Sequence, residues 1–237
     1  MRLLTALLLL VLVAGTSYFH TPATVASAAP ALYDDNDEED EEFDEDGDSL
    51  DEFVDEVIDA ADDFWTGVFK ERGKRYHPPL VVKAASEQRV RSKCGNSRGA
   101  EHSYCGTDET VFLDWDSDDE TSIVNLWDDD RSFVIVTTIG HEWGHHVQKL
   151  LGVFDIDTRS VEVENQADCL MGLFARSYAK SSDWVGRADL KDAIQDTRDS
   201  GDDPDTPARE RTHGTPEQRV DAFMRGYRGK SVSACGL

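Results

Sequence analysis

The sequence predicts an α+β domain that is mainly helical and carries a small sheet. Apolar residues recur at three- and four-residue steps along most of the chain, which is the spacing of amphipathic helices. The segments with this spacing are 50–69, the run through 133–145, 161–178, 187–199 and 216–228. Only 80–82 and 110–113 have the character of short strands, and Pro78 and Pro79 separate the first of them from any preceding helix.

The first 28 residues have the pattern of a secretory signal peptide. Arg2 supplies the charged start, 3–14 are almost all apolar, and 26–28 form an Ala-Ser-Ala cleavage site. The apolar stretch is shorter than the about twenty residues that a membrane-spanning helix needs. We therefore expect cleavage after Ala28 and a secreted or extracytoplasmic protein without stable membrane association. An uncleaved N-terminal membrane anchor is the alternative.

An acidic segment follows over 29–52. From 33 to 52, 14 of the 20 residues are Asp or Glu, and none is Lys or Arg. Such a run cannot bury enough apolar surface to fold, so the segment is expected to be disordered, as a solvated tail or alternatively as a spacer or pro-segment. The remaining residues, 53–237, are enough for a single domain with one core.

Acidity extends over the whole chain, whose formal net charge is -25. Further acidic patches lie at 116–120, 128–130 and 199–205. This charge argues against nucleic acid and against anionic membrane surfaces as partners, because both would be repelled. It is compatible with basic substrates or simply with solubility, and the sequence carries no signal of the oligomeric state.

The chain contains four cysteines, an even number after a signal peptide, which favours disulfides. Cys94 and Cys105 flank a Gly-containing loop and can close a short ring. Cys169 is then expected to pair with Cys235 and to fasten the C-terminus to the helix over 161–178. A cysteine zinc site is the alternative, but the spacing of Cys94 and Cys105 does not fit a C-x-x-C knuckle.

The motif H-E-x-x-H, formed by His141, Glu142 and His145, carries the main chemical signal. Positions four apart share one helix face, so both imidazoles can bind a single Zn²⁺ ion. Glu142 is then placed to act as general base on a water at the metal. The alternative is a helix with two hydrogen-bonded histidines and an exposed glutamate. The apolar run 133–139 disfavours it, because buried polar groups need partners or a metal.

The next helix offers a third metal ligand. Glu164 and Asp168 are four apart and share a face, whereas Glu162 points to another side. We expect Glu164 to be the third ligand and Asp168 to accept a hydrogen bond from a ligand histidine. A solvated acidic face is the alternative. The related pattern H-E-x-x-H-x-x-G-x-x-H is absent, because position 151 is Leu.

Four blocks of this sequence resemble the family of neutral zinc metallopeptidases. They are His-Glu-Trp-Gly-His-His-Val-Gln at 141–148, Glu-Asn-Gln-Ala-Asp-Cys at 164–169, Thr-His-Gly-Thr-Pro-Glu-Gln-Arg at 212–219, and a late Gly226-Tyr227 with Cys235. The resemblance covers roughly 55 to 237 and implies an exported or membrane-anchored, zincin-like metallopeptidase domain with an active-site helix. By analogy with such peptidases, one of the predicted short strands would run along that helix as an edge that pairs with substrate.

The sequence therefore predicts Zn²⁺-dependent hydrolysis of peptide bonds in a peptide or protein substrate. His213 is the candidate donor to the developing oxyanion, with Tyr227 and Arg219 behind it, and a loop histidine with a structural hydrogen bond is the alternative. His146 is expected to be structural. Two other functions stay open: a non-catalytic secreted protein that binds a partner through its zinc site, and a zinc amidase that acts on peptidoglycan.

Overall fold

The computed structural model describes residues 45–85, 90–95, 101–115, 120–153 and 160–237. The predicted signal peptide, most of the predicted acidic segment and most of the acidic patch at 116–120 lie outside these residues. Within the described ranges, no helix is both long enough and apolar enough to cross a membrane.

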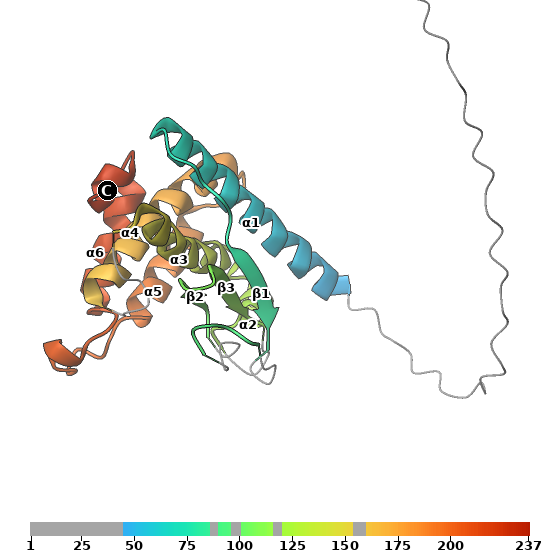
Figure 1. Ribbon diagram of the computed structural model, residues 1–237. Coiled ribbons are helices and arrows are strands. Elements are labelled where there is room, and N and C mark those ends of the chain that lie inside the picture. The colour runs from blue at the N-terminus through green and yellow to red at the C-terminus, as the bar shows by residue number, and fades with distance from the viewer. Residues whose placement is uncertain (1–44, 86–89, 96–100, 116–119, 154–159) are drawn as a thin grey trace, which may run out of the picture. The chain divides into compact units, whose positions relative to one another are not determined.

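Helices dominate the described residues, with a small three-stranded sheet beside them (Figure 1). The α-helices are α1 (Glu45–Glu71), α2 (Ile123–Asp128), α3 (Ser132–Leu151), α4 (Val161–Ser181), α5 (Arg187–Asp199) and α6 (Pro216–Arg228). Short 3₁₀ helices are η1 (Ala208–Glu210) and η2 (Val232–Cys235), and the strands are β1 (Leu80–Ala84), β2 (Ser103–Cys105) and β3 (Thr110–Asp114). The predicted α+β, mainly helical class is confirmed.

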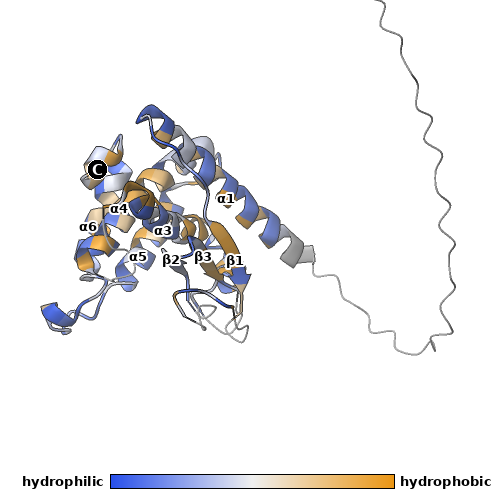
Figure 2. Ribbon diagram, in the orientation of Figure 1, coloured by the Kyte–Doolittle hydropathy of each residue, from blue (hydrophilic) through white to orange (hydrophobic). Residues whose placement is uncertain are grey.

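The start of α1 corrects the predicted boundary of the acidic segment. The helix begins at Glu45, so 45–52 are helical rather than disordered. The reason is that the apolar stripe of α1 begins inside the acidic run: Leu50 is buried, as are Val54 and Val57 on the following turns. Figure 2 shows the resulting alternation of hydrophilic and apolar residues along α1.

The sheet has the strand order β1-β3-β2. β1 runs parallel to the central strand β3, with Leu80 opposite Thr110, and β2 runs antiparallel to it, with Ser103 opposite Phe112. All five residues of β3 are buried. The two predicted strands are present, whereas β2 was not predicted, because its three residues are too few for a strand pattern.

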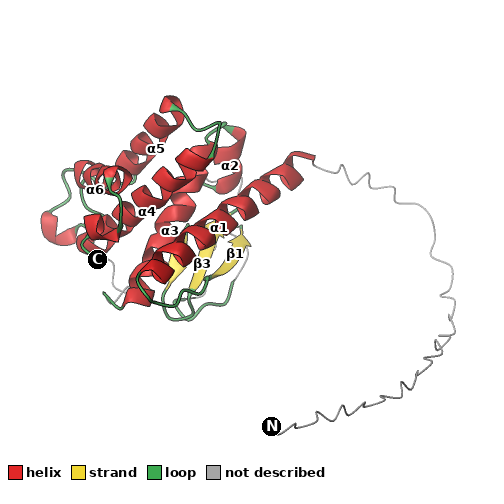
Figure 3. Cartoon of the chain, turned by 90° about the horizontal axis from the view of Figure 1, so that it is seen from above, coloured by secondary structure: helices red, strands yellow, loops and turns green. Residues whose placement is uncertain are grey.

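Small residues allow α4 to pack closely against α3 on one side and α6 on the other (Figure 3). A Cβ atom on Gly144 of α3 would lie 2.9 Å from the carbonyl oxygen of Ala167. A Cβ atom on Gly226 of α6 would lie 1.8 Å from the carbonyl oxygen of Cys169. Any larger residue at these two positions would push the helices apart, so glycine allows the backbone of α4 to lie directly against both neighbours.

Both predicted disulfides are present. Cys94 is bonded to Cys105 at the end of β2, and Cys169 on α4 is bonded to Cys235 in η2. The first bond joins residues 11 apart and the second joins residues 66 apart. The second bond holds the C-terminal 3₁₀ helix against α4, as the sequence predicted.

Candidate metal centre

The H-E-x-x-H motif lies in the second half of α3. Gly152 ends this helix in the left-handed conformation, with φ of 65°. Its N–H donates to the carbonyl oxygens of Gln148 and Lys149. The chain returns to α4, where the Ser160 hydroxyl accepts a hydrogen bond from the Val163 amide and caps the helix. This geometry places the first two turns of α4 beside the last turns of α3.

Three side chains converge between the two helices. Glu164 Oε2 lies 3.2 Å from His141 Nε2 and 3.6 Å from His145 Nε2. One ligand atom from each of the three residues lies within 4.8 Å of the others. Glu162 is exposed on another side of α4. Two imidazole nitrogens and one carboxylate oxygen form the donor set of many catalytic zinc sites, so these residues fit that metal.

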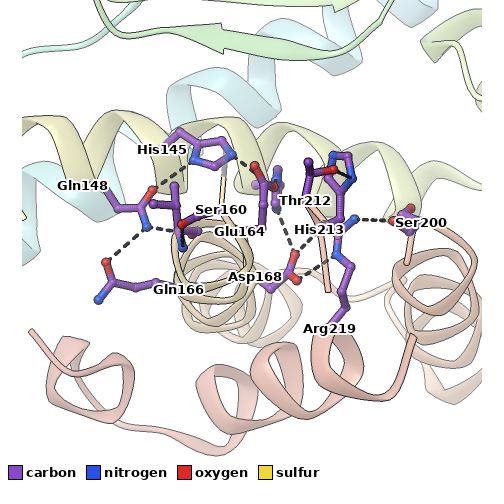
Figure 4. Close-up of polar contacts among 12 residues, drawn as sticks. His145, Gln148, Ser160, Glu164, Gln166, Asp168, Ser200, Thr212, His213 and Arg219 are labelled. Atoms are coloured by element: carbon purple, nitrogen blue, oxygen red, sulfur yellow. Dashed lines mark hydrogen bonds and ion pairs between the residues drawn. The ribbon is translucent and has the colours of Figure 1, made fainter. Parts of the chain in front are cut away.

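Asp168 supports His141 from the other side of the imidazole. His141 Nδ1 donates to Asp168 Oδ1 at 2.9 Å. Arg219 of α6 donates to both oxygens of Asp168, at 2.9 and 2.8 Å, and to the carbonyl oxygen of Ser200 at 2.8 Å (Figure 4). This interaction fixes the tautomer of His141 and directs Nε2 toward Glu164.

The carboxylates of Asp168 and Glu164 favour positive charge at His141, which a proton or a metal ion can supply. Burial lowers the pKa of His141, but hydrogen bonds to Asp168 and Glu164 outweigh it and raise that pKa to about 10. Burial also opposes ionisation of Asp168, but the charge of Arg219 and its hydrogen bonds hold the Asp168 pKa below its usual value. The carboxylate therefore remains ionised although the side chain is completely buried.

His145 is supported by neutral amides instead. Its Nδ1 lies 3.0 Å from Gln148 Oε1. Gln148 Nε2 donates to the carbonyl oxygen of Val163 at 2.8 Å and to Gln166 Oε1 at 3.1 Å (Figure 4). Gln166 Nε2 in turn donates to the carbonyl oxygen of Cys235 at 3.0 Å. The sequence did not single out Gln148 or Gln166 as functional residues.

Glu142 lies in the same cleft as the three converging side chains. The cleft has a volume of about 660 Å³ and is lined by His141, Glu142, His145 and Glu164, among others. Glu142 is 5% exposed, and its Oε2 has no hydrogen-bond partner among the described residues. A buried polar atom without a partner is costly, so this carboxylate oxygen is available to a group that enters the cleft.

His213 also lines the cleft, from the loop before α6. The amides of Thr212, His213 and Gly214 all donate to Asp202 Oδ2, at 3.0, 2.9 and 2.8 Å. His213 Nδ1 lies 3.0 Å from the Thr212 hydroxyl. The Asp202 carboxylate thus fixes the backbone of the loop from which His213 reaches the cleft. The sequence did not reveal this role of Asp202.

Two residues that the sequence placed behind His213 have other positions. Arg219 lines the cleft, but three of its hydrogen bonds go to Asp168 and to the Ser200 carbonyl. Tyr227 does not line this cleft and instead borders a separate hollow with Arg176. It lies eight residues after Arg219, or about 12 Å further along the same helix, so its assignment to the oxyanion group was wrong.

His146 lies on the opposite face of α3 from the metal centre. It is completely buried, with Nε2 2.8 Å from the His77 carbonyl oxygen and Nδ1 2.9 Å from the Tyr104 hydroxyl. The prediction of a structural role agrees with these contacts. Tyr104 belongs to β2, so His146 ties the active-site helix to that strand.

The strand beside the cleft is β2 and neither of the two predicted strands. Ser103 and Tyr104 line the cleft, whereas no residue of β1 or β3 does. β3 is the central strand and is paired on both sides, so it cannot offer a free edge. Among the three strands, the one that lines the cleft is therefore the strand that the sequence did not reveal.

Comparisons with known proteins gave one family model and several relatives. A family model described as "Putative neutral zinc metallopeptidase" matches residues 4–237. "Uncharacterized protein YpfJ" of Escherichia coli (strain K12) is 29% identical over 207 residues, which cover 74% of this chain and 67% of YpfJ. "Uncharacterized protein Rv2575" of Mycobacterium tuberculosis is 29% identical over 156 residues, which cover 56% of this chain and 53% of Rv2575. No solved structure matches this chain.

Proposed function

This chain belongs to the neutral zinc metallopeptidase family, and from that premise we propose that it is a secreted peptidase that hydrolyses peptide bonds with zinc. One observation carries the proposal. Three zinc-type donors converge on one point, and the unpartnered carboxylate oxygen of Glu142 lies in the same cleft. A site that only held a structural metal would have no need of that buried, unpaired carboxylate.

His141, His145 and Glu164 would hold the metal. Zinc bound by three protein ligands lowers the pKa of a water molecule toward neutrality and polarises the carbonyl group that the water attacks. The protein's own contribution is the orientation of the donors: Asp168 fixes one imidazole and Gln148 fixes the other. In both imidazoles the lone pair is therefore on Nε2, which is free to bind the metal.

Glu142 acts as the general base. Its carboxylate accepts a proton from the attacking water, the remaining hydroxide adds to the carbonyl carbon, and the C–N bond then breaks. The same proton passes from Glu142 to the leaving nitrogen, which departs as an amine. His213 lines the same cleft and donates a hydrogen bond to the oxygen on which negative charge develops.

The substrate is a peptide or protein segment rather than nucleic acid. An outer strand, β2, lines the cleft, and an extended peptide is the ligand that pairs with a strand edge. The net charge of -25 disfavours polyanions. Export is supported by the signal-peptide pattern and by two disulfides, which persist in oxidising compartments.

The test uses purified protein over 29–237, expressed under oxidising conditions. We expect about one zinc per chain and cleavage of a mixed fluorogenic peptide library. Chelation should abolish this cleavage, and added zinc should restore it. Bound zinc with no peptide cleavage would contradict the peptidase and favour a binding protein. Release of peptides from peptidoglycan fragments, with the peptide library intact, would point to an amidase.

A further inference from the structure

We infer that Gln148 and Gln166 are positioning residues for the metal, because together they tie the ligand His145 to the disulfide-bonded C-terminus. The contacts form one continuous line from the imidazole of His145 to the carbonyl oxygen of Cys235. The line crosses from α3 to the next helix, α4, and then to η2 near the C-terminus. Figure 4 shows its first part, from His145 through Gln148 to Gln166.

The direction of each hydrogen bond in this line is determined. Gln148 Nε2 faces two oxygen acceptors, the Val163 carbonyl and Gln166 Oε1, so its other atom, Oε1, faces His145. An amide oxygen only accepts, and the hydrogen must therefore reside on His145 Nδ1. The lone pair of the imidazole is then on Nε2, the atom that lies 3.6 Å from Glu164.

Gln166 continues this order toward the C-terminus. Its Oε1 accepts from Gln148, so its Nε2 is free to donate, and it donates to the carbonyl oxygen of Cys235 at 3.0 Å. A reversed Gln166 amide would place a nitrogen against a nitrogen and an oxygen against an oxygen. The Cys235 carbonyl thus selects the orientation of the Gln166 amide. Gln166 and the Val163 carbonyl together select that of Gln148, and through it the tautomer of His145.

A covalent bond holds the last acceptor in place. Gln166 and Cys169 are three residues apart on α4, so they lie on the same face, and Cys169 is bonded to Cys235. The disulfide therefore holds the η2 backbone over the Gln166 side chain. Val232, in the same short helix, is buried in the apolar core and also holds η2 in place.

The effects should be graded along the line. Gln148 touches the ligand itself, and loss of such a partner typically weakens metal binding about 10- to 100-fold. Gln166 is one step further away, and Gln148 keeps its bond to Val163 without it. Removal of the Cys169–Cys235 bond acts only through Gln166. We therefore expect Gln148 to matter most for zinc affinity, then Gln166, then the disulfide.

The inference rests on the metal site proposed above, and its test measures zinc affinity rather than hydrolysis. Zinc dissociation constants are measured by competition with a chelator for the parent, Gln148→Met and Gln166→Met. Methionine keeps the length of the side chain but cannot form these hydrogen bonds. Gln195→Met is the matched control, because Gln195 is exposed on α5 and bonds only Asp199 in the described structure.

We expect weaker zinc binding by about 10- to 100-fold in Gln148→Met, by a smaller factor in Gln166→Met, and no change in Gln195→Met. The melting temperature of each metal-free variant shows whether a loss reflects general unfolding. Unchanged affinity in folded Gln148→Met or Gln166→Met would overturn the inference while leaving the metal site intact. A parent protein that does not bind zinc would overturn both.

A double-mutant cycle tests the C-terminal end of the line. The pair Cys169→Ser with Cys235→Ser should weaken zinc binding in the parent but add little in the Gln166→Met background, because Gln166→Met already removes the hydrogen bond to Cys235 through which the disulfide acts. The control pair is Cys94→Ser with Cys105→Ser, which removes the other disulfide and should leave zinc affinity unchanged. Fully additive losses would contradict a shared line. If the disulfide variant unfolds, Gln166→Met, which retains both disulfides, still decides the matter.

Discussion

The two histidines of the metal centre lie one helical turn apart, but opposite kinds of partner hold them. His141 is held by a buried ion pair, in which Asp168 receives both its hydrogen bond and a bidentate contact from Arg219. His145 is held by two neutral amides that end at a backbone carbonyl. We refer to these as the charged arm and the neutral arm.

The difference concerns what each arm needs in order to stay intact. Asp168 is completely buried, so its charge is tolerable only while Arg219 compensates it. The neutral arm buries no charge, and each of its amides keeps a second partner or solvent access. Loss of the charged arm should therefore mainly lower the unfolding free energy of the protein, whereas loss of the neutral arm should mainly lower its affinity for zinc.

The largest effect on activity is expected at a residue that belongs to neither arm. Glu142→Gln removes the proton acceptor but keeps the shape of the side chain, so hydrolysis should fall about 100- to 10,000-fold. Zinc content and melting temperature should stay at parent values, since both arms remain intact. Rates are compared with Glu162→Gln, an exposed glutamate on α4. Activity equal to the parent would show that Glu142 is not the base.

Arg219→Met tests whether the charged arm carries stability. Without Arg219 the buried Asp168 carboxylate loses its compensating charge, and such losses typically cost about 3–5 kcal/mol of unfolding free energy. Arg198→Met is the control, because Arg198 forms an exposed ion pair with Glu217 and should cost about 0–1 kcal/mol. Urea denaturation of the metal-free proteins measures both. If Gln148→Met destabilises the fold as much as Arg219→Met, the contrast between the arms fails.

The two disulfides extend the same comparison. Cys169–Cys235 closes a loop of 66 residues and ends the neutral arm, whereas Cys94–Cys105 closes a loop of 11. In the chain-entropy model, the paired serine substitutions should cost about 4 kcal/mol for the long loop and about 3 kcal/mol for the short one. Denaturation midpoints measure this difference. Equal costs would mean that native-state contacts, rather than loop length, set the contribution of each bond.

The charged arm was partly predictable from sequence, and the neutral arm was not. Asp168 lies four residues after Glu164, and this spacing alone indicated a shared helix face. Gln148 lies three residues after His145, but a neutral amide on a helix has many ordinary roles. Its function depends on meeting Gln166 and then Cys235, and contacts between separate elements leave no periodic signal in the chain.

The same reason explains the errors around the cleft. Tyr227 was grouped with His213 as a further candidate donor, but α6 packs so that Tyr227 borders the separate hollow with Arg176. β2 has only three residues, and its pairing with β3 beside the disulfide makes it a strand. Position on a single helix was predictable, whereas the rotation and pairing of separate elements were not.

The smallest effect is expected around His146, the third histidine of α3, which lies outside the metal centre. His146 Nε2 faces the carbonyl oxygen of His77, which can only accept, so Nε2 carries the hydrogen and Nδ1 accepts from the Tyr104 hydroxyl. Burial lowers the pKa of His146, which agrees with a neutral ring.

Tyr104→Phe leaves His146 Nδ1 without its donor and should cost about 1 kcal/mol of unfolding free energy. Zinc affinity should not change, because His146 is directed away from Glu164 and belongs to neither arm. Tyr227→Phe, in the separate hollow, is the control and should change stability by less than about 0.5 kcal/mol. Chelator competition and urea denaturation on the same samples separate the two effects. A loss of zinc affinity in Tyr104→Phe comparable with that of Gln148→Met would mean that β2 supports the metal as a third arm, and the two-arm description would have to be abandoned.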